Sequence, residues 1–234
     1  RALLSETASP LRISIVIPTL NEAGQIAEVI EQTRALGDCE ILVVDGGSTD
    51  NTLEKAQAAD AVIASKPGRA VQQNTGAKTS RGEVLLFLHA DCRLQPGSFE
   101  AIQTALQDPR CVGGCFRQRI EAPGWKYRLM ERGNGLRVRL LKWAYGDQGI
   151  FVRRSCFEEL GGFPELRLME DLYFMKRLKR KGQFALIDPP IHISARRWQK
   201  KGILRQTLRN WTLITMAHCG ISPDRLARFY PHVR

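Results

Sequence analysis

A short run near the start of the chain decides the fold: Ile13-Ser-Ile-Val-Ile-Pro-Thr-Leu-Asn-Glu22. Its first five residues are rich in β-branched and apolar side chains, which are typical of a buried strand. Pro18 ends the apolar run, and an amphipathic helix is predicted over Asn21–Leu36. The run therefore predicts a buried strand that leads through a polar loop into a helix.

The same order repeats along the first half of the chain. Further strands are predicted at Glu40–Val44, Ala61–Ala64 and Val84–Leu88, and helices at Thr52–Ala59, Ala70–Thr79 and Pro96–Leu106. Strands that alternate with helices build a parallel sheet covered by those helices. The sequence therefore predicts an α/β protein.

The alternation loosens after about residue 110. Strands are predicted at Val112–Ile120, Gly149–Val152 and Phe184–Ile187, and helices at Trp125–Trp143, Ser155–Leu160, Glu170–Lys181, Gly202–Cys219 and Pro223–Arg228. We expect the helix at Trp125–Trp143 to be broken near Gly133–Gly135, because glycine is a poor helix former. Residues 1–234 are predicted to form a single domain, with two main parts at 12–115 and 116–200 and C-terminal helices at 201–234.

The composition favours an anionic partner. The chain has 234 residues, 43% of them hydrophobic, and a formal net charge of +11. The apolar fraction is enough for a packed core, and the charge suits nucleic acid, an anionic membrane surface or a phosphorylated substrate. Basic residues are dense in Trp125–Lys142 and Lys176–Lys181. The charge alone does not choose among these partners.

The cysteines and the hydropathy pattern indicate a reducing compartment. No Cys-x-x-Cys pair and no zinc-like spacing occurs, so buried free thiols are predicted. No secretory signal and no apolar stretch long enough to cross a membrane is visible, which favours a cytoplasmic location. The six cysteines are Cys39, Cys92, Cys111, Cys115, Cys156 and Cys219.

Polar residues follow three of the predicted strands, at Pro18–Glu22, Asp45–Asp50 and His89–Asp91. Ligands of open α/β sheets bind beyond the carboxyl ends of the strands. Asp45 ends an apolar strand and can accept hydrogen bonds from a nucleobase. Polar residues at such places also cap the next helix, which is the role that we expect for Asp50.

Two neighbouring motifs suit a diphosphate. His89 and Asp91 lie two residues apart, so in extended backbone they point the same way and can ligate a divalent cation. Gly68 opens a predicted helix and is followed by Arg69. Helix N-termini and arginine both favour phosphate oxygens.

Three motifs of the second half allow two interpretations each. Glu170-Asp171 opens a predicted helix, where acids commonly stabilise the helix dipole. Asp147-Gln148 forms a polar turn before a strand, and Arg197-Trp198 joins a cation to an aromatic ring. From the residues alone, a structural role and a ligand contact both stay open.

Together these motifs resemble those of family 2 glycosyltransferases, and most closely those of a small, uncharacterised bacterial subgroup. The resemblance covers about Ile13 to Gly202 and implies the GT-A fold, a mixed, mainly parallel sheet flanked by helices. The matching segments are Ile15–Glu22, Val43–Asp50, Gly68-Arg69 with Asn74-x-Gly76 and Gly82-Glu83, His89-Ala90-Asp91 in place of the usual Asp-x-Asp, and the Glu170-Asp171 pair.

The resemblance implies a role for each part of the chain. Residues 12–115 form the nucleotide-sugar-binding half, and 116–200 the acceptor and catalytic half. The donor, a UDP-sugar as we expect, contacts residues of the matching motifs. These are Pro18, Thr19, Asn21, Glu22, Asp45, Gly47, Gly68, Arg69, Asn74, His89, Ala90 and Asp91.

The resemblance also implies the chemistry, an inverting transfer to an acceptor hydroxyl. Asp171 is the general base, and Glu170 orients it or the acceptor. Asp91, with His89 where the family has an acid, holds Mg²⁺ or Mn²⁺. Contacts with the acceptor or the phosphates are expected from Asp147, Gln148, Arg197 and Trp198.

The expected partners follow from the resemblance and the charge. The acceptor is unidentified, and a lipid-linked acceptor stays open. So does a peripheral contact with an anionic membrane at the inner face of the plasma membrane. No nucleic acid is expected, because no nucleic-acid-binding motif appears.

The sequence also bears on three other classes of protein. A nucleotidyltransferase needs a glycine-rich loop with lysine after the first strand, but Pro18–Gly24 has one glycine and no lysine or arginine. A Rossmann oxidoreductase needs G-x-G-x-x-G there, which is absent. The remaining alternative is a basic nucleotide- or membrane-binding protein of the same fold with little or no transferase activity.

Overall fold

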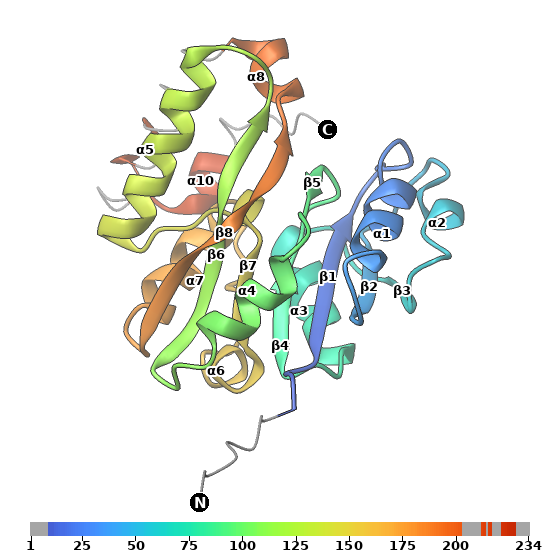
Figure 1. Ribbon diagram of the computed structural model, residues 1–234. Coiled ribbons are helices and arrows are strands. Elements are labelled where there is room, and N and C mark those ends of the chain that lie inside the picture. Colours follow the sequence, from blue (N-terminus) through green and yellow to red (C-terminus); the bar gives the residue numbers. More distant parts are fainter. Residues whose placement is uncertain (1–8, 203–211, 214, 217–220, 228–234) are drawn as a thin grey trace, which may run out of the picture.

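A central sheet with helices on both faces makes up the molecule (Figure 1). The structure is a computed structural model that describes residues 9–202, 212–213, 215–216 and 221–227. The sheet has eight strands in the order β3-β2-β1-β4-β7-β6-β8-β5. They are β1 (Ile13–Thr19), β2 (Glu40–Asp45), β3 (Ala61–Ala64), β4 (Val84–Phe87), β5 (Cys92–Arg93), β6 (Cys111–Glu121), β7 (Ile150–Arg153) and β8 (Gln183–Ser194).

The sheet is parallel in its first half and mixed in its second. Strands β3, β2, β1 and β4 run parallel to one another. β7 is antiparallel to both β4 and β6, β8 is parallel to β6, and β5 is antiparallel to β8. The predicted α/β class with a mixed, mainly parallel sheet is therefore confirmed.

The helices follow the strands much as predicted. The longer ones are α1 (Ile26–Arg34), α3 (Arg69–Thr79), α4 (Ser98–Ala105), α5 (Trp125–Leu141) and α7 (Glu170–Leu178). The shorter ones are α2 (Thr52–Lys55), α6 (Arg154–Glu159), α8 (Arg196–Lys201), α10 (Pro223–Ala227) and a 3₁₀ turn, η1 (Gly146–Gln148). Most of the helix predicted at Gly202–Cys219 lies outside the described residues.

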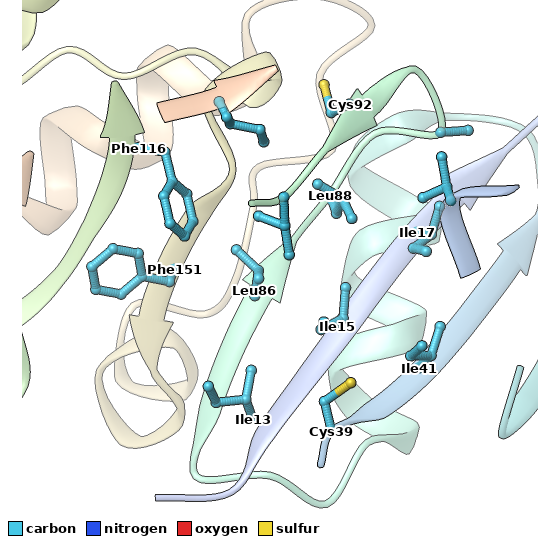
Figure 2. Packing of buried hydrophobic residues seen from close by; sticks show 14 of the residues in the cluster. Ile13, Ile15, Ile17, Cys39, Ile41, Leu86, Leu88, Cys92, Phe116 and Phe151 are labelled. Atoms are coloured by element: carbon cyan, nitrogen blue, oxygen red, sulfur yellow. The ribbon is translucent and has the colours of Figure 1, made fainter. Parts of the chain in front are cut away.

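Alternate residues of the strands enter two separate cores. Ile15 and Ile17 of β1 pack on the side of α1 and α4, as Figure 2 shows for the strand residues of this cluster, whereas Val16 faces α3. Helix α3 comes so close to β1 that a Cβ atom on Gly76 would lie 2.4 Å from Val16 Cγ1. Glycine at 76 therefore allows the helix that carries Arg69 to rest on the sheet.

Some predicted boundaries were wrong. Helix α1 begins at Ile26 rather than Asn21, because residues 21–25 form a turn in which Gln25 N donates to Glu22 O at 3.0 Å. Helix α5 runs unbroken through Gly133 and Gly135, where packing on β6 outweighs the low helix propensity of glycine. Strand β8 extends well beyond Ile187, and the short elements β5 and α8 were missed.

The described cysteines are buried free thiols, as predicted. They are Cys39, Cys92, Cys111, Cys115 and Cys156, whereas Cys219 lies outside the described residues. Burial raises the pKa of the Cys39 thiol to about 11, so this thiol is protonated at neutral pH. Among the described residues, no helix has the length and apolarity needed to cross a bilayer.

Candidate active site

The loop after β2 is built around the Asp45 carboxylate, which is almost fully buried. Its Oδ2 accepts the backbone N–H groups of Gly47 at 2.9 Å and Ser48 at 2.8 Å. Its Oδ1 accepts the Ser48 hydroxyl and, at 3.2 Å, the Thr19 hydroxyl from the end of β1. Because four internal hydrogen bonds already reach this carboxylate, its role in this structure is to shape the loop.

The loop after β1 is tied to the loop after β2. Asn21 has a positive φ of 57°, a conformation that asparagine tolerates better than most residues. Its backbone N–H donates to Ser48 Oγ at 2.8 Å, and its side-chain Oδ1 accepts the Thr49 N–H at 2.8 Å. Asp50 accepts the N–H of Thr52, the first residue of α2, at 3.0 Å, but the N-cap residue is Asn51 rather than Asp50 as we predicted. The predicted donor residues of these loops thus form one preassembled surface.

A buried glutamine that the sequence did not single out holds the two strand ends together. Gln72, on α3, is 1% exposed. Its Nε2 donates to Thr19 O at 2.7 Å and to Val44 O at 2.8 Å. No local pattern reveals this role, because the two acceptors lie 53 and 28 residues away.

His89, Asp91 and Cys92 form a group that can hold a metal ion. One ligand atom from each of the three residues lies within 4.8 Å of the others. The backbone here is a turn, with Cys92 N donating to His89 O at 3.0 Å, rather than the extended segment that we predicted. The predicted pair still comes together, and Cys92 is an addition to it.

The donor set of this group decides which cation it fits. Cys92 is fully buried in the apolar cluster (Figure 2), and its Sγ lies 3.7 Å from Asp91 Oδ1. His89 and Asp91 are partly exposed and are the accessible ligands. A carboxylate with an imidazole suits Mn²⁺ better than Mg²⁺, which prefers oxygen ligands throughout. The residues fit a divalent cation, with Mn²⁺ favoured.

The Asp171 carboxylate lies beside this group and is held by two backbone donors. The Gly146 N–H donates to Oδ2 at 2.7 Å, and the Leu172 N–H donates to Oδ1 at 2.7 Å. A Cβ atom on Gly146 would lie 2.7 Å from His89 Nε2 and 3.7 Å from Asp171 Oδ2. The metal-capable group and the Asp171 carboxylate therefore both border Gly146.

The surroundings of Asp171 raise the pKa of its carboxyl group to about 6. Burial is the largest cause, and the negative charge of Glu170 adds to it. The positive charge of Arg69 and the two backbone N–H groups act in the opposite direction. Although part of the residue reaches solvent, protein surrounds its carboxyl group. A carboxylate of this kind is ionised at pH 7 and is a stronger base than an exposed aspartate.

An ion pair joins the two halves of the chain at this point. Arg69 Nη1, at the start of α3, lies 3.0 Å from Glu170 Oε1, whose side chain is 3% exposed. Met169, just before Glu170, has a positive φ of 65°, a strained conformation for this residue type. Such strain is typical of functional sites, and here it fixes the start of α7 beside the loop at Gly146.

Arg137, on α5, supports the loop that carries Gly146. Its guanidinium stacks on the Tyr145 ring, 3.7 Å from the ring centre, and donates to Gln148 Oε1 at 2.7 Å. Gln148 is fully buried, and its Oε1 also accepts the Tyr145 N–H at 3.1 Å. Instead of offering a polar group to a ligand as we expected, Gln148 fixes η1, and through Gly146 it fixes Asp171.

Two further residues that we predicted to bind the sugar donor, Asn74 and Ala90, have structural roles instead. Asn74 donates to Phe163 O at 2.8 Å and accepts the Phe163 N–H at 2.9 Å, so both ends of its amide join α3 to the loop before α7. The Ala90 side chain lies in the apolar core. Neither side chain is available to a nucleotide in this structure.

The remaining predicted residues surround the same region. Pro18 is the one half-buried residue of the otherwise buried strand β1. Glu22 donates its backbone N–H to Thr52 Oγ1 at 2.8 Å, and Gly68, with a φ of 141°, precedes α3. The carbonyl oxygen of Asp147 lies 3.7 Å from Cys92 Sγ, so this turn touches the metal-capable group.

Helix α8 begins beside the same group, because Ser194 N donates to Asp91 O at 3.4 Å. Arg197 belongs to this helix, and its side chain lies outside the described part of the structure. Trp198 is partly buried against the core. For the predicted Arg197-Trp198 contact, the structure therefore shows only that both residues belong to the helix that begins beside the metal-capable group.

Sequence comparison relates the chain to known proteins. A family model described as "Glycosyl transferase family 2" matches residues 14–162. Glycosyltransferase AglJ of Haloferax volcanii is 34% identical over 150 residues, which cover 59% of this chain and 47% of that protein. An undecaprenyl-phosphate 4-deoxy-4-formamido-L-arabinose transferase of Pseudomonas aeruginosa is 30% identical over 165 residues, which cover 63% of this chain and 49% of that protein. The matched region thus spans about half the length of these two relatives.

Solved structures share the fold. S. aureus TarS 1-349 in complex with UDP has a TM-score of 0.64 at 17% identity, covering 79% of this chain and 60% of that one. Glucosyl-3-phosphoglycerate synthase from Mycobacterium tuberculosis, in complex with Mn²⁺, UDP and glucosyl-3-phosphoglycerate, has a TM-score of 0.57 at 21% identity, covering 79% and 70%. At these sequence identities the structural similarity shows that the fold is shared and nothing more. Since the family model spans more than half of the sequence, the chain belongs to glycosyl transferase family 2.

Proposed function

We propose that this protein transfers a sugar from a nucleoside-diphosphate sugar to an acceptor hydroxyl. The transfer inverts the configuration at the anomeric carbon, and Asp171 is the general base. One observation carries the proposal. A metal-capable group and a carboxylate with a raised pKa meet around Gly146, where the carboxyl end of β4 faces the start of α7. A cation site and a base that border the same small residue suit a displacement between a diphosphate and a hydroxyl.

In this proposal Asp171 takes the proton of the acceptor hydroxyl. As that O–H bond breaks, the acceptor oxygen bonds to the anomeric carbon, and the bond from that carbon to the diphosphate oxygen breaks on the other side. The Gly146 and Leu172 N–H groups keep both Asp171 oxygens in place during the transfer. Glu170 is the positioning residue, because its pair with Arg69 anchors the helix start that carries the base.

The donor half holds the leaving group. Asp91 and His89 would hold Mn²⁺ or Mg²⁺, which neutralises charge on the diphosphate when bound. Arg69 adds a cation at the start of α3. The loops around Asn21 and Asp45 form the preassembled surface on which the nucleoside would lie.

The partners are proposed from the relatives. TarS has been solved with UDP and with UDP-GlcNAc, and the M. tuberculosis synthase with UDP and Mn²⁺, which supports a UDP-sugar as donor. The P. aeruginosa relative is named for undecaprenyl phosphate, a lipid phosphate. We therefore propose a cytoplasmic protein that meets a lipid-linked acceptor at an anionic membrane face, and no nucleic acid as partner.

A thermal-shift screen of nucleotide sugars with Mn²⁺ and Mg²⁺ tests the donor half. We expect one UDP-sugar, with Mn²⁺, to raise the Tm by about 5 °C or more at a ligand concentration of about a hundred times its Kd. Other bases and metal-free samples should give smaller shifts. A flat response to every nucleotide sugar, with either metal, contradicts the proposal and favours the alternative of a basic membrane-binding protein without transferase activity.

The pH dependence of transfer tests the base. Asp171 must be deprotonated to accept a proton, so kcat/KM should rise with pH through the pKa of about 6 and level off above it. The charge of Glu170 raises the pKa of Asp171, so Glu170→Gln should move this acidic limb to lower pH. Glu165→Gln, a change of an exposed acid, is the matched control and should leave the limb in place. A limb that Glu170→Gln moves upward, or leaves where it is, contradicts the assignment.

A further inference from the structure

Helix α5 carries an apolar surface on the side that faces away from the protein. Among the described residues, all but one of the large exposed hydrophobic side chains belong to this helix, and the exception is Leu53. The side chains of Trp125, Leu129, Leu136 and Leu140 are 70%, 61%, 56% and 71% exposed. We call these four residues the apolar stripe. Contiguous exposed apolar surface of this kind marks a contact site.

The members of the apolar stripe lie on one side of the helix. Its members are separated by four, seven and four positions, and such spacings return to the same side of an α-helix. The opposite side of α5 holds the buried residues Glu131 and Val138, which face the sheet. Figure 1 shows α5 on the outer edge of the molecule, alongside β6 and β8. The inner face of the helix thus packs on the sheet, as is usual. The outer face is apolar, whereas the solvent-facing side of a helix is usually polar.

A basic groove lies beside the apolar stripe, between α5 and the strands β6 and β8. It has a volume of about 590 Å³, and arginines are the commonest residue in its lining. Five arginines face two carboxylates, Glu131 and Asp188. The arginines are Arg117, Arg119, Arg128, Arg132 and Arg139.

The carboxylates do not neutralise all of these arginines. Arg117 pairs with Asp188 at 2.7 Å, and Arg128 pairs with Glu131 at 2.9 Å. Arg132 and Arg139 are exposed, and neither forms an ion pair with another described residue. Both belong to α5, so two unneutralised cations border the apolar stripe.

We propose that α5 binds the surface of an anionic lipid bilayer, lying in the plane of the interface. The apolar stripe enters the boundary between headgroups and acyl chains, and the arginine groove receives lipid phosphates. Trp125 at one end of the helix suits the interface, where tryptophan is enriched. This inference rests on the proposed function and assigns its membrane contact to the apolar stripe and the arginine groove. Membrane binding by this surface can be measured without measuring sugar transfer.

Charge argues for lipid against a second copy of the chain. Pairing two α5 surfaces about a two-fold axis would bring the unneutralised arginines of both copies close together, which is repulsive. Nucleic acid would satisfy the arginines but would leave four large apolar side chains in water. An anionic bilayer satisfies both the charge and the apolar surface.

Sedimentation with lipid vesicles tests the proposal on the full chain. We expect binding to vesicles of phosphatidylcholine with phosphatidylglycerol, and little binding to phosphatidylcholine alone. Leu136→Glu with Leu140→Glu should weaken binding at least about tenfold, because two side chains no longer enter the bilayer. Arg132→Gln with Arg139→Gln should weaken it about thirtyfold, the effect of two interfacial cations.

Matched controls lie on the other side of the molecule. Leu53→Glu changes an exposed leucine of α2, and Lys55→Gln with Lys78→Gln removes the same charge from α2 and α3. Each control should bind vesicles like the unchanged protein. Calorimetric binding of UDP with Mn²⁺ should be the same for all variants, which shows that they are folded and separates this surface from the proposed donor site.

Three results would overturn the proposal. The first is equal binding to neutral and anionic vesicles, or to neither. The second is unchanged anionic binding after both pairs of α5 substitutions. The third is a dimer in lipid-free buffer that the leucine substitutions dissociate, detected by sedimentation velocity, because a second copy then covers the apolar stripe.

Discussion

Asp171→Asn is expected to lower kcat for sugar transfer by about 10²- to 10⁴-fold, the range that a positioned general base contributes. The amide keeps the size of the side chain but cannot take the acceptor proton. Burial raises the pKa of Asp171 and makes it a stronger base than an exposed aspartate. We therefore expect that a solvent molecule cannot take over its role in the variant. Initial rates with saturating UDP-sugar and acceptor measure the effect.

Two comparisons make this result specific. Calorimetry should find the affinity of Asp171→Asn for UDP and Mn²⁺ unchanged, because the proposal assigns Asp171 to the acceptor and not to the donor. Asp147→Asn alters the carboxylate of the turn that touches Cys92, and should raise the KM of the acceptor more than it lowers kcat. If the two variants exchange these phenotypes, Asp147 is the base. Wild-type transfer by Asp171→Asn would remove the base from the proposal.

Asp91→Ala is expected to weaken Mn²⁺-dependent binding of UDP at least about a hundredfold, since losing even an outer-shell partner of a metal ligand costs up to that much. Asp91 supplies the one carboxylate of the metal-capable group. His89 and Cys92 without it offer only nitrogen and sulfur, a set that suits neither Mn²⁺ nor Mg²⁺. Calorimetric titration of UDP with and without Mn²⁺ gives the effect directly.

The matched control for this substitution is Asp38→Ala, which removes an exposed carboxylate from the loop before β2. It should bind UDP and Mn²⁺ like the unchanged protein. Titration of Mn²⁺ alone, followed by electron paramagnetic resonance, gives a second readout that does not depend on the nucleotide. UDP affinity that is the same with and without Mn²⁺ in the unchanged protein would contradict the metal role of Asp91.

The first half of the fold could be predicted from sequence because its elements are set locally. Each strand is a short apolar run, each is followed by a polar loop, and the runs alternate with amphipathic helices. The carboxyl ends of such strands meet at one edge of the sheet, so the grouping of the loops at Asn21, Asp45 and Asp91 follows from topology. The Glu170-Asp171 pair was found through the family resemblance, since locally it is an ordinary helix start.

The second half depends on contacts that no local pattern records. Strand β8 continues past Pro189 and Pro190 because both prolines fall at an irregularity of its pairing with β6, between the paired residues Ile187 and Ile191. The sequence alone favours an end before two prolines. Gln72, Arg137 and Gln148 each act on backbone groups or side chains that fold toward them from elsewhere in the chain. Their identity as polar residues is visible in the sequence, but their partners are not.

The missing side chain at position 146 couples this position sterically to position 89. With any residue other than glycine there, a Cβ atom would press against the imidazole of His89, which stands where most of the family has an acid. A shorter acidic side chain at 89 would leave that space open. Positions 89 and 146 are therefore not free to vary independently, and the effect of a substitution at one should depend on the residue at the other.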